Sequence, residues 1–180
     1  GADERDYLRR RGGRGGLRWR GASRSFELFY DAARQRSVAA DTDFALLGDL
    51  PATNPAIDEG IDRAVEARLR WGTGPLSPWR IELAHRVAGG ALAGDFDYAR
   101  SEIGVLRRTF VKRFELQTTA TYVRTIGAPP VQRLADVGGV STVRGHPRRS
   151  LVGEESLALR AELPIPYDLL RRTRIPVVRD

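Results

Sequence analysis

Residues 65–71, VEARLRW, alternate strictly between apolar and charged side chains. Successive side chains of a β-strand point to opposite faces, so this stretch places Val65, Ala67, Leu69 and Trp71 together. Glu66, Arg68 and Arg70 then lie on the other face, whereas a helical period of 3.6 would mix the two kinds. The pattern predicts a strand within residues 60–73 that has one apolar face and one charged face.

The same alternation recurs along most of the chain. It is clear in residues 24–38, 78–89, 113–126 and 153–164, and weaker in 7–20, 94–110 and 173–180. The sequence therefore predicts about eight strands, many of ten residues or more, whereas strands of soluble proteins average about five or six. Strands that cross a membrane need about 9–11 residues. We expect an all-β fold, an antiparallel transmembrane β-barrel.

The connections between these strands alternate in length. Short ones fall at 21–23, 74–77, 111–112 and roughly 165–172, and long ones at 39–59 and 128–153, with the link at 90–94 as an exception. Trp19, Trp71 and Trp79 all lie beside short connections. Short turns at one end, longer loops at the other and an aromatic girdle are typical of outer-membrane barrels. A soluble β-sandwich whose hairpins are stapled by aromatic side chains is the alternative.

The charged face of the predicted strands carries both signs. In a barrel this face lines a water-filled lumen, where opposite charges can pair across strands. It carries Glu27, Glu66, Arg68, Arg70, Arg80, Glu82, Arg86, Arg160 and Glu162.

The composition gives little support to nucleic-acid binding or to catalysis. The net charge of +7 comes from arginines that are spread along the chain and mixed with acids, so no nucleic-acid partner is expected. There is no cysteine, and the two histidines, His85 and His146, are not spaced as a metal site. Ser141 lacks the spacing of a nucleophile elbow. We therefore expect that the protein is not an enzyme and binds no metal ion or cofactor.

A glycine-rich segment interrupts the alternation. Residues 138–146, GGVSTVRGH, lie in the long connection 128–153, and the strand after it ends in Glu162-Leu163-Pro164. A loop of this length is usually functional or disordered. The segment resembles the Val-Arg-Gly signature of the outer-membrane assembly superfamily, which includes the BamA and TamA insertases and the two-partner-secretion transporters. The following strand, with its acidic residue and proline, extends the resemblance.

The resemblance implies roles for particular residues. In the superfamily this loop folds back into the barrel lumen and its arginine pairs with acids on the next two strands. Arg144 would be the loop arginine, and Glu162 and Asp180 its wall partners. The loop set is completed by Gly138, Gly139, Val143, Gly145 and His146, the last replacing the usual aromatic residue. The alternation independently places Glu162 on the charged face.

The resemblance also implies a function and a location. Residues 1–180 would be a partial barrel of about eight strands out of sixteen in the bacterial outer membrane. The barrel would insert or translocate proteins, with unfolded outer-membrane or secreted proteins as clients. Its other partners would be the lipid bilayer and periplasmic or lipoprotein assembly factors. Three alternatives stay open: a two-partner-secretion exporter, the membrane anchor of a fused patatin-like lipase with catalysis outside this chain, and a soluble ligand-binding β-sandwich.

Overall fold

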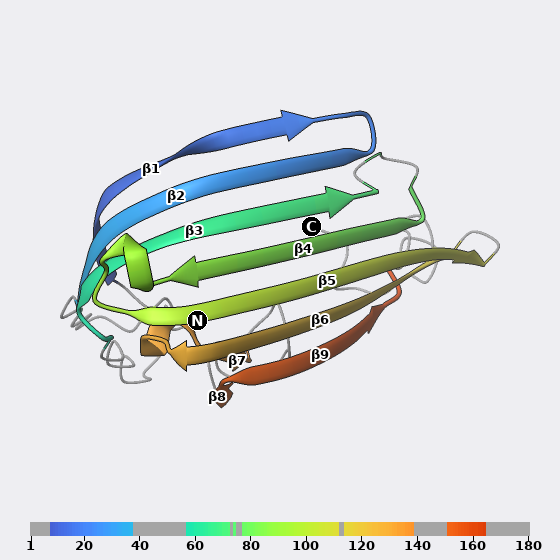
Figure 1. Ribbon diagram of the computed structural model, residues 1–180. Coiled ribbons are helices and arrows are strands. Elements are labelled where there is room, and N and C mark those ends of the chain that lie inside the picture. The colour runs from blue at the N-terminus through green and yellow to red at the C-terminus, as the bar shows by residue number, and fades with distance from the viewer. Residues whose placement is uncertain are drawn as a thin grey trace, which may run out of the picture.

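The computed structural model describes residues 8–37, 57–72, 74, 77–111, 114–138 and 151–164. In this part of the chain seven strands lie side by side in one sheet (Figure 1). Their bounds are β1 Leu8–Arg20, β2 Arg24–Ser37, β3 Gly60–Trp71, β4 Trp79–Ala88, β5 Asp97–Val111, β6 Phe114–Ala128 and β9 Glu155–Glu162. Six of them have 10 to 15 residues, and the all-β prediction is confirmed.

The sheet is antiparallel throughout, with the order β1-β2-β3-β4-β5-β6-β9. Within the described residues β1 pairs only with β2 and β9 only with β6, so the sheet is open and no closed ring of strands is seen. A second sheet joins β7 (Ala135–Val137) to β8 (Leu151–Gly153). None of the helices described is long and apolar enough to cross a membrane.

The register keeps like residues together on each side of the sheet. Leu69 lies opposite Leu83, and Glu66 lies opposite Arg86 on the neighbouring strand. The alternation of each strand therefore adds up to two continuous surfaces. The apolar face carries Leu17, Trp19, Phe26, Leu28, Val65, Leu69, Trp71, Ile81, Leu83 and Ile103. The polar face carries Glu27, Asp31, Asp62, Glu66, Arg68, Arg70, Arg86, Tyr98, Arg100 and Glu102.

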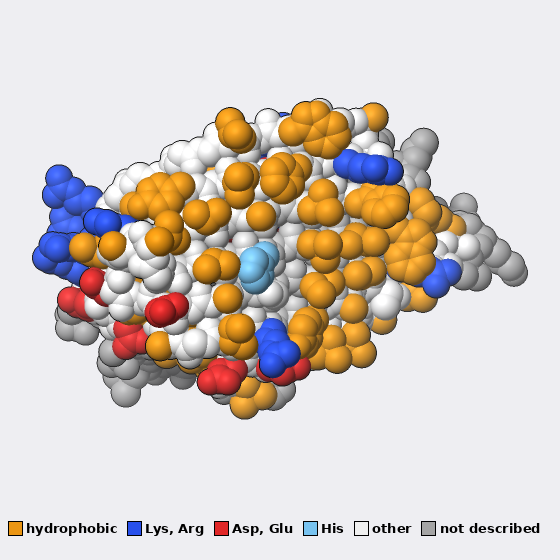
Figure 2. All heavy atoms as spheres, in the orientation of Figure 1, with side chains coloured by type: hydrophobic (Ala, Val, Ile, Leu, Met, Phe, Trp, Pro, Cys, Tyr) orange, Lys and Arg blue, Asp and Glu red, His pale blue; other side chains and the backbone are white. Residues whose placement is uncertain are grey.

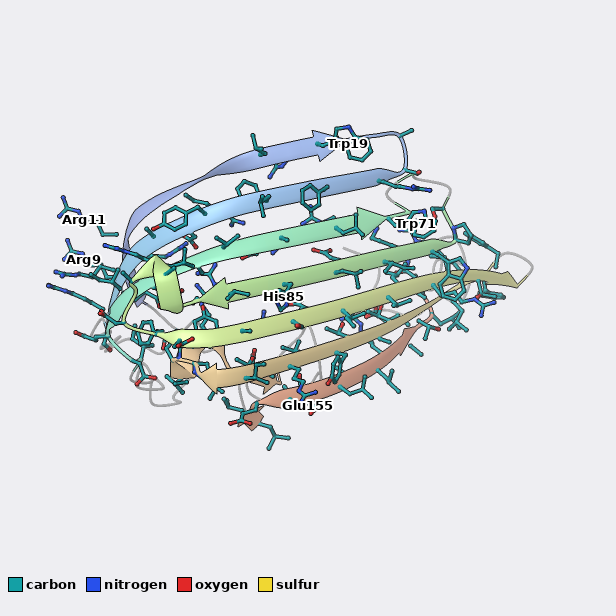
Figure 3. All side chains as sticks on the ribbon, viewed as in Figure 1. Arg9, Arg11, Trp19, Trp71, His85 and Glu155 are labelled. Carbon is teal, nitrogen blue, oxygen red and sulfur yellow. The ribbon has the colours of Figure 1, made fainter. Side chains whose placement is uncertain are left out.

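The two ends of the sheet differ as predicted. The turn from β1 to β2 and the link from β3 to β4 lie at one end, here called the short-turn end, where Figure 3 labels Trp19 and Trp71. The connections from β2 to β3, from β4 to β5 and from β6 to β9 lie at the other end, the loop end. At the short-turn end Gly72 has φ 75°, and a side chain there would meet the carbonyl of Trp79. The link from β3 to β4 therefore requires glycine at this position.

Glycine also shapes the edge strand β1. A Cβ on Gly16 would collide with the backbone and ring of Phe29, which lies directly opposite in the register. The ring fills the place that a side chain would have taken on the polar face. The guanidinium carbons of Arg14 and Arg18 lie 4.1 and 5.8 Å from the centre of this ring. These cation–π contacts tie the edge strand to its neighbour.

The long connection 128–153 contains more regular structure than the sequence predicted. It includes the 3-10 turn η2 (Val131–Arg133), β7 and β8. These elements are too short for a period to be recognised, and η2 follows Pro129 and Pro130, which read only as a break. The link at 90–94 forms a second 3-10 turn, η1 (Gly90–Leu92). The predicted strand 173–180 lies outside the described residues.

Candidate functional site: a buried charge network on the polar face

The pattern of burial on the sheet is the reverse of that in a water-soluble fold. Polar and charged side chains are buried, among them Ser25, Glu27, Asp31, Gln35, Asp62, Arg86 and Thr125. Large apolar side chains are exposed, as with Leu17 at 75% and Leu159 at 72%. Figure 2 shows hydrophobic side chains spread over the apolar face, with the acids toward one end and one edge and basic side chains at both ends.

Arg86 on β4 is the centre of the buried network. Its side chain is 6% exposed, and its guanidinium reaches three carboxylates on two other strands. The nitrogen–oxygen distances are 2.8 Å to Asp62, 3.2 Å to Asp31 and 3.3 Å to Glu66. The Arg86 Nε also donates a hydrogen bond of 2.9 Å to the hydroxyl of Tyr98 on β5. One cation thus joins four neighbouring strands, β2 to β5.

Asp62 on β3 is the main acceptor of the network and is 1% exposed. Besides Arg86, its carboxylate accepts hydrogen bonds from Gln35 at 3.2 Å and from Arg133 at 2.9 Å. The Tyr98 hydroxyl lies 3.3 Å from both of its oxygens. A buried carboxylate is stable only when its oxygens are paired in this way.

The segment that follows β6 folds back onto the polar face at the loop end. Arg133 reaches Asp62, and Gln132 donates to the side chain of Gln35 at 2.8 Å and to the carbonyl of Asp58 at 2.9 Å. The Asp58 carboxylate accepts from the backbone N–H of Val131 at 2.6 Å. Residues 131–133 are therefore fastened to β2, to β3 and to the residues just before β3.

Charge pairing continues from the network toward the short-turn end. Glu27 lies 2.7 Å from Arg18 and 3.3 Å from Arg70. Glu66 lies 2.9 Å from Arg68, and Arg70 lies 3.2 Å from Glu82. The polar face carries charged side chains of both signs that pair across the strands, as the sequence predicted.

A histidine, His85, lies on the apolar face, as the alternation of the sequence predicted. His85 lies near the middle of the face in Figure 3, and its Nδ1 is 2.9 Å from the Ser101 hydroxyl on β5. At the short-turn end Arg24 stacks over Trp71 and Arg107 over Trp79, each at 4.9 Å from the ring centre. The described residues contain no group of three His, Asp or Glu side chains that could hold a metal ion.

Two residues of the predicted site lie in the described part of the chain. Gly138 is buried directly after β7, with φ 133°, a backbone conformation that favours glycine. Glu162 ends β9 on the polar face, opposite Gln117 and 3.7 Å from the Arg160 guanidinium. Gly139, Val143, Arg144, Gly145, His146 and Asp180 lie outside the described residues, so the pairing of Arg144 with either acid stays a prediction.

The buried network was only partly foreseen. The alternation placed Glu66 and Arg86 on the charged face, but it gave no reason to single out Asp62, Tyr98 or Arg133. The signal for Asp62 is weak, because it lies near the start of the strand, before the clear alternation of residues 65–71. Arg133 lies in a segment with no period, so its return to β3 depends on tertiary structure alone.

The geometry defines an antiparallel all-β protein that buries a charged network on one face of its sheet and exposes large apolar side chains on the other. No protein-family model matches the chain, and no curated protein matches it significantly. The likeness to the outer-membrane assembly superfamily therefore depends on the residues of the 138–146 segment and on the strands around it.

Proposed function

We propose that this chain forms part of the wall of a transmembrane β-barrel in the bacterial outer membrane. The apolar face contacts lipid and the polar face lines the lumen. The observation that carries the proposal is the reversed burial: a charged network centred on Arg86 and Asp62 is buried while the leucines and tryptophans opposite are exposed.

Physical chemistry favours lipid as the environment of the apolar face. Exposing apolar surface to water costs about 25 cal/mol for each Å², and soluble monomers rarely expose large continuous apolar patches. A soluble sandwich would cover such a face with a second sheet. In the described part of the chain the only other sheet is the short β7–β8 pair, and β7 follows the segment fastened to the polar side.

The same arrangement supports a lumen on the polar side. Membrane-spanning strands of about 9–11 residues are long enough for a tilted crossing, and β2 to β6 meet this length. The tryptophans at the short-turn end are half exposed on the apolar face, where an interfacial girdle would lie. In this orientation the loop end faces the cell exterior.

The finer proposal is that the barrel inserts or translocates other proteins, as the resemblance implies. The residues that lead into the 138–146 segment support it, because residues 131–133 are fastened to the polar wall and Gly138 follows β7 directly. A chain entering the signature from this position starts on the lumen side. Unfolded outer-membrane or secreted proteins would be the clients, with periplasmic or lipoprotein factors as partners.

A loop variant in the intact protein tests this function. Arg144→Ala is expected to lower the amount of folded client protein in the outer membrane several-fold, because it removes the predicted pairing of the loop arginine with acids of the wall. Arg149→Ala, in the same connection but outside the signature, is the control and should leave client levels unchanged. Wild-type client levels in both variants would refute the assembly function, and a chain that folds and stays dispersed without detergent would refute the barrel.

A further inference from the structure

On the two strands β1 and β2 the apolar face ends in arginines at the loop end. On β1 the apolar face ends at Arg11 and on β2 at Arg34, and these two positions are partners in the register. Arg9 and Arg36 lie one step further out on the same face. Figure 3 labels Arg9 and Arg11 at this end of β1, and Figure 2 shows a basic cluster there.

These arginines face one another across the strands. Arg9 is the register partner of Arg36, and Arg11 is that of Arg34. Like charges directly opposite on one face repel and destabilise a strand pair. All four side chains are exposed, and no described residue forms an ion pair with any of them. Among the described residues, four cations thus lie together on β1 and β2 with no ion-pair partner.

Two carboxylates at this end accept hydrogen bonds from backbone groups. Glu59 accepts a hydrogen bond from the Ser37 backbone N–H at 2.9 Å, and Asp95 accepts one from the Ile61 backbone N–H at 2.6 Å. These hydrogen bonds fix the ends of β2 and β3, and among the described residues neither acid forms an ion pair with the four arginines. A bound anion would relieve the repulsion among them.

We propose that Arg9, Arg11, Arg34 and Arg36 bind the phosphate of an anionic lipid headgroup at the loop end of the barrel. This inference rests on the proposed membrane location, because it needs the apolar face beside the arginines to lie among acyl chains. A guanidinium fork pairs bidentately with phosphate. The abrupt change from apolar side chains to arginine on the same face places the cations where headgroups begin, which favours a lipid over a free anion.

The test is lipid retention by the intact, detergent-solubilised protein in native mass spectrometry. Phosphatidylglycerol, phosphatidylcholine and inorganic phosphate are offered in turn. Wild type is expected to retain phosphatidylglycerol at least about tenfold more tightly than either of the others. Arg11→Gln with Arg34→Gln should weaken that binding about thirtyfold, because each arginine near an anionic surface contributes roughly fivefold.

Two further variants make the result specific. Arg20→Gln with Arg80→Gln removes the same charge from exposed polar-face positions at the short-turn end and should change binding less than about twofold. Arg11→Lys with Arg34→Lys keeps the charge and should retain most of the affinity. The Arg11→Gln, Arg34→Gln protein should fold at least as stably as wild type, because a repulsion is removed.

The outcomes separate this inference from the barrel itself. A protein that enters vesicles but binds phosphatidylglycerol equally in both glutamine variants would refute the lipid site alone. Equal binding of inorganic phosphate, or equal losses in the lysine and glutamine variants, would also overturn it. A protein that never enters vesicles would refute both proposals.

Discussion

Asp62→Asn is the substitution that most directly probes the buried network. The change keeps the size of the side chain but removes its charge. Asp62 is 1% exposed and is the common acceptor for Arg86 at 2.8 Å, Arg133 at 2.9 Å and Gln35 at 3.2 Å. All three donors converge on Oδ2, so an asparagine oxygen in that place can still accept from them, and its amide group would replace Oδ1, beside the Tyr98 hydroxyl. What the substitution removes is the negative charge that compensates the two guanidinium groups.

The expected loss follows from what remains around Arg86. Removing one partner of a buried ion pair costs about 3–5 kcal/mol. Arg86 keeps Asp31 at 3.2 Å and Glu66 at 3.3 Å, so the lower end applies. We expect the free energy of unfolding to fall by about 3 kcal/mol. The control is Glu82→Gln, whose side chain is 39% exposed and pairs with Arg70 at 3.2 Å; a pair as open as this is worth about 1 kcal/mol or less.

The assay is reversible urea unfolding of the intact protein in lipid vesicles, followed by tryptophan fluorescence. Trp19, Trp71 and Trp79 lie exposed on the apolar face, so their emission reports the loss of lipid contact. If Asp62→Asn lowered the free energy of unfolding no more than Glu82→Gln does, the reasoning would be refuted. Such a result would mean that the charges of the network are not shielded from water.

Three further predictions use the same preparations. Arg133→Gln should raise hydrogen exchange at the amides of residues 135–137 at least about tenfold by releasing the segment from Asp62, and unchanged exchange would contradict the fastening. Leu69→Arg should lower the free energy of unfolding in vesicles by about 2–4 kcal/mol, because it puts a charge on the lipid face; a loss below about 1 kcal/mol would count against lipid contact there. Gly16→Ala should cost about 1–3 kcal/mol by striking the Phe29 ring, whereas the neighbouring Gly15→Ala, whose Cβ meets nothing, should be nearly neutral; equal losses would contradict the close approach.

The strands could be predicted because their signal is local. In residues 65–71 the polarity of each side chain indicates which face of the strand it occupies. The structure places Leu69 and Glu66 on the faces that the period of two predicts. The alternation of short and long connections likewise fixed which strand ends lie together. The sequence could not say whether the sheet closes, since closure depends on pairing between distant edges.

The charge network was harder to predict because it depends on register and on chain return. Arg86 meets Glu66 only when β3 and β4 pair as they do, and Asp62 meets Arg133 only when the segment after β6 folds back. Neither the register of two strands nor the return of a later segment produces a periodic pattern in the sequence. The residues of the 138–146 signature beyond Gly138 lie outside the described part, so their role is still the prediction made from resemblance.

The most direct test of the central claim is which face of the sheet touches lipid. The chain has no cysteine, so single cysteines introduced at positions 81–84 of β4 can each carry a spin label without interference. In vesicles the account predicts a period of two: labels at Ile81 and Leu83 collide mainly with dissolved oxygen, and labels at Glu82 and Ala84 with a water-soluble nickel chelate. Equal access of the chelate to all four labels, or the opposite alternation, would contradict a lipid-facing apolar surface.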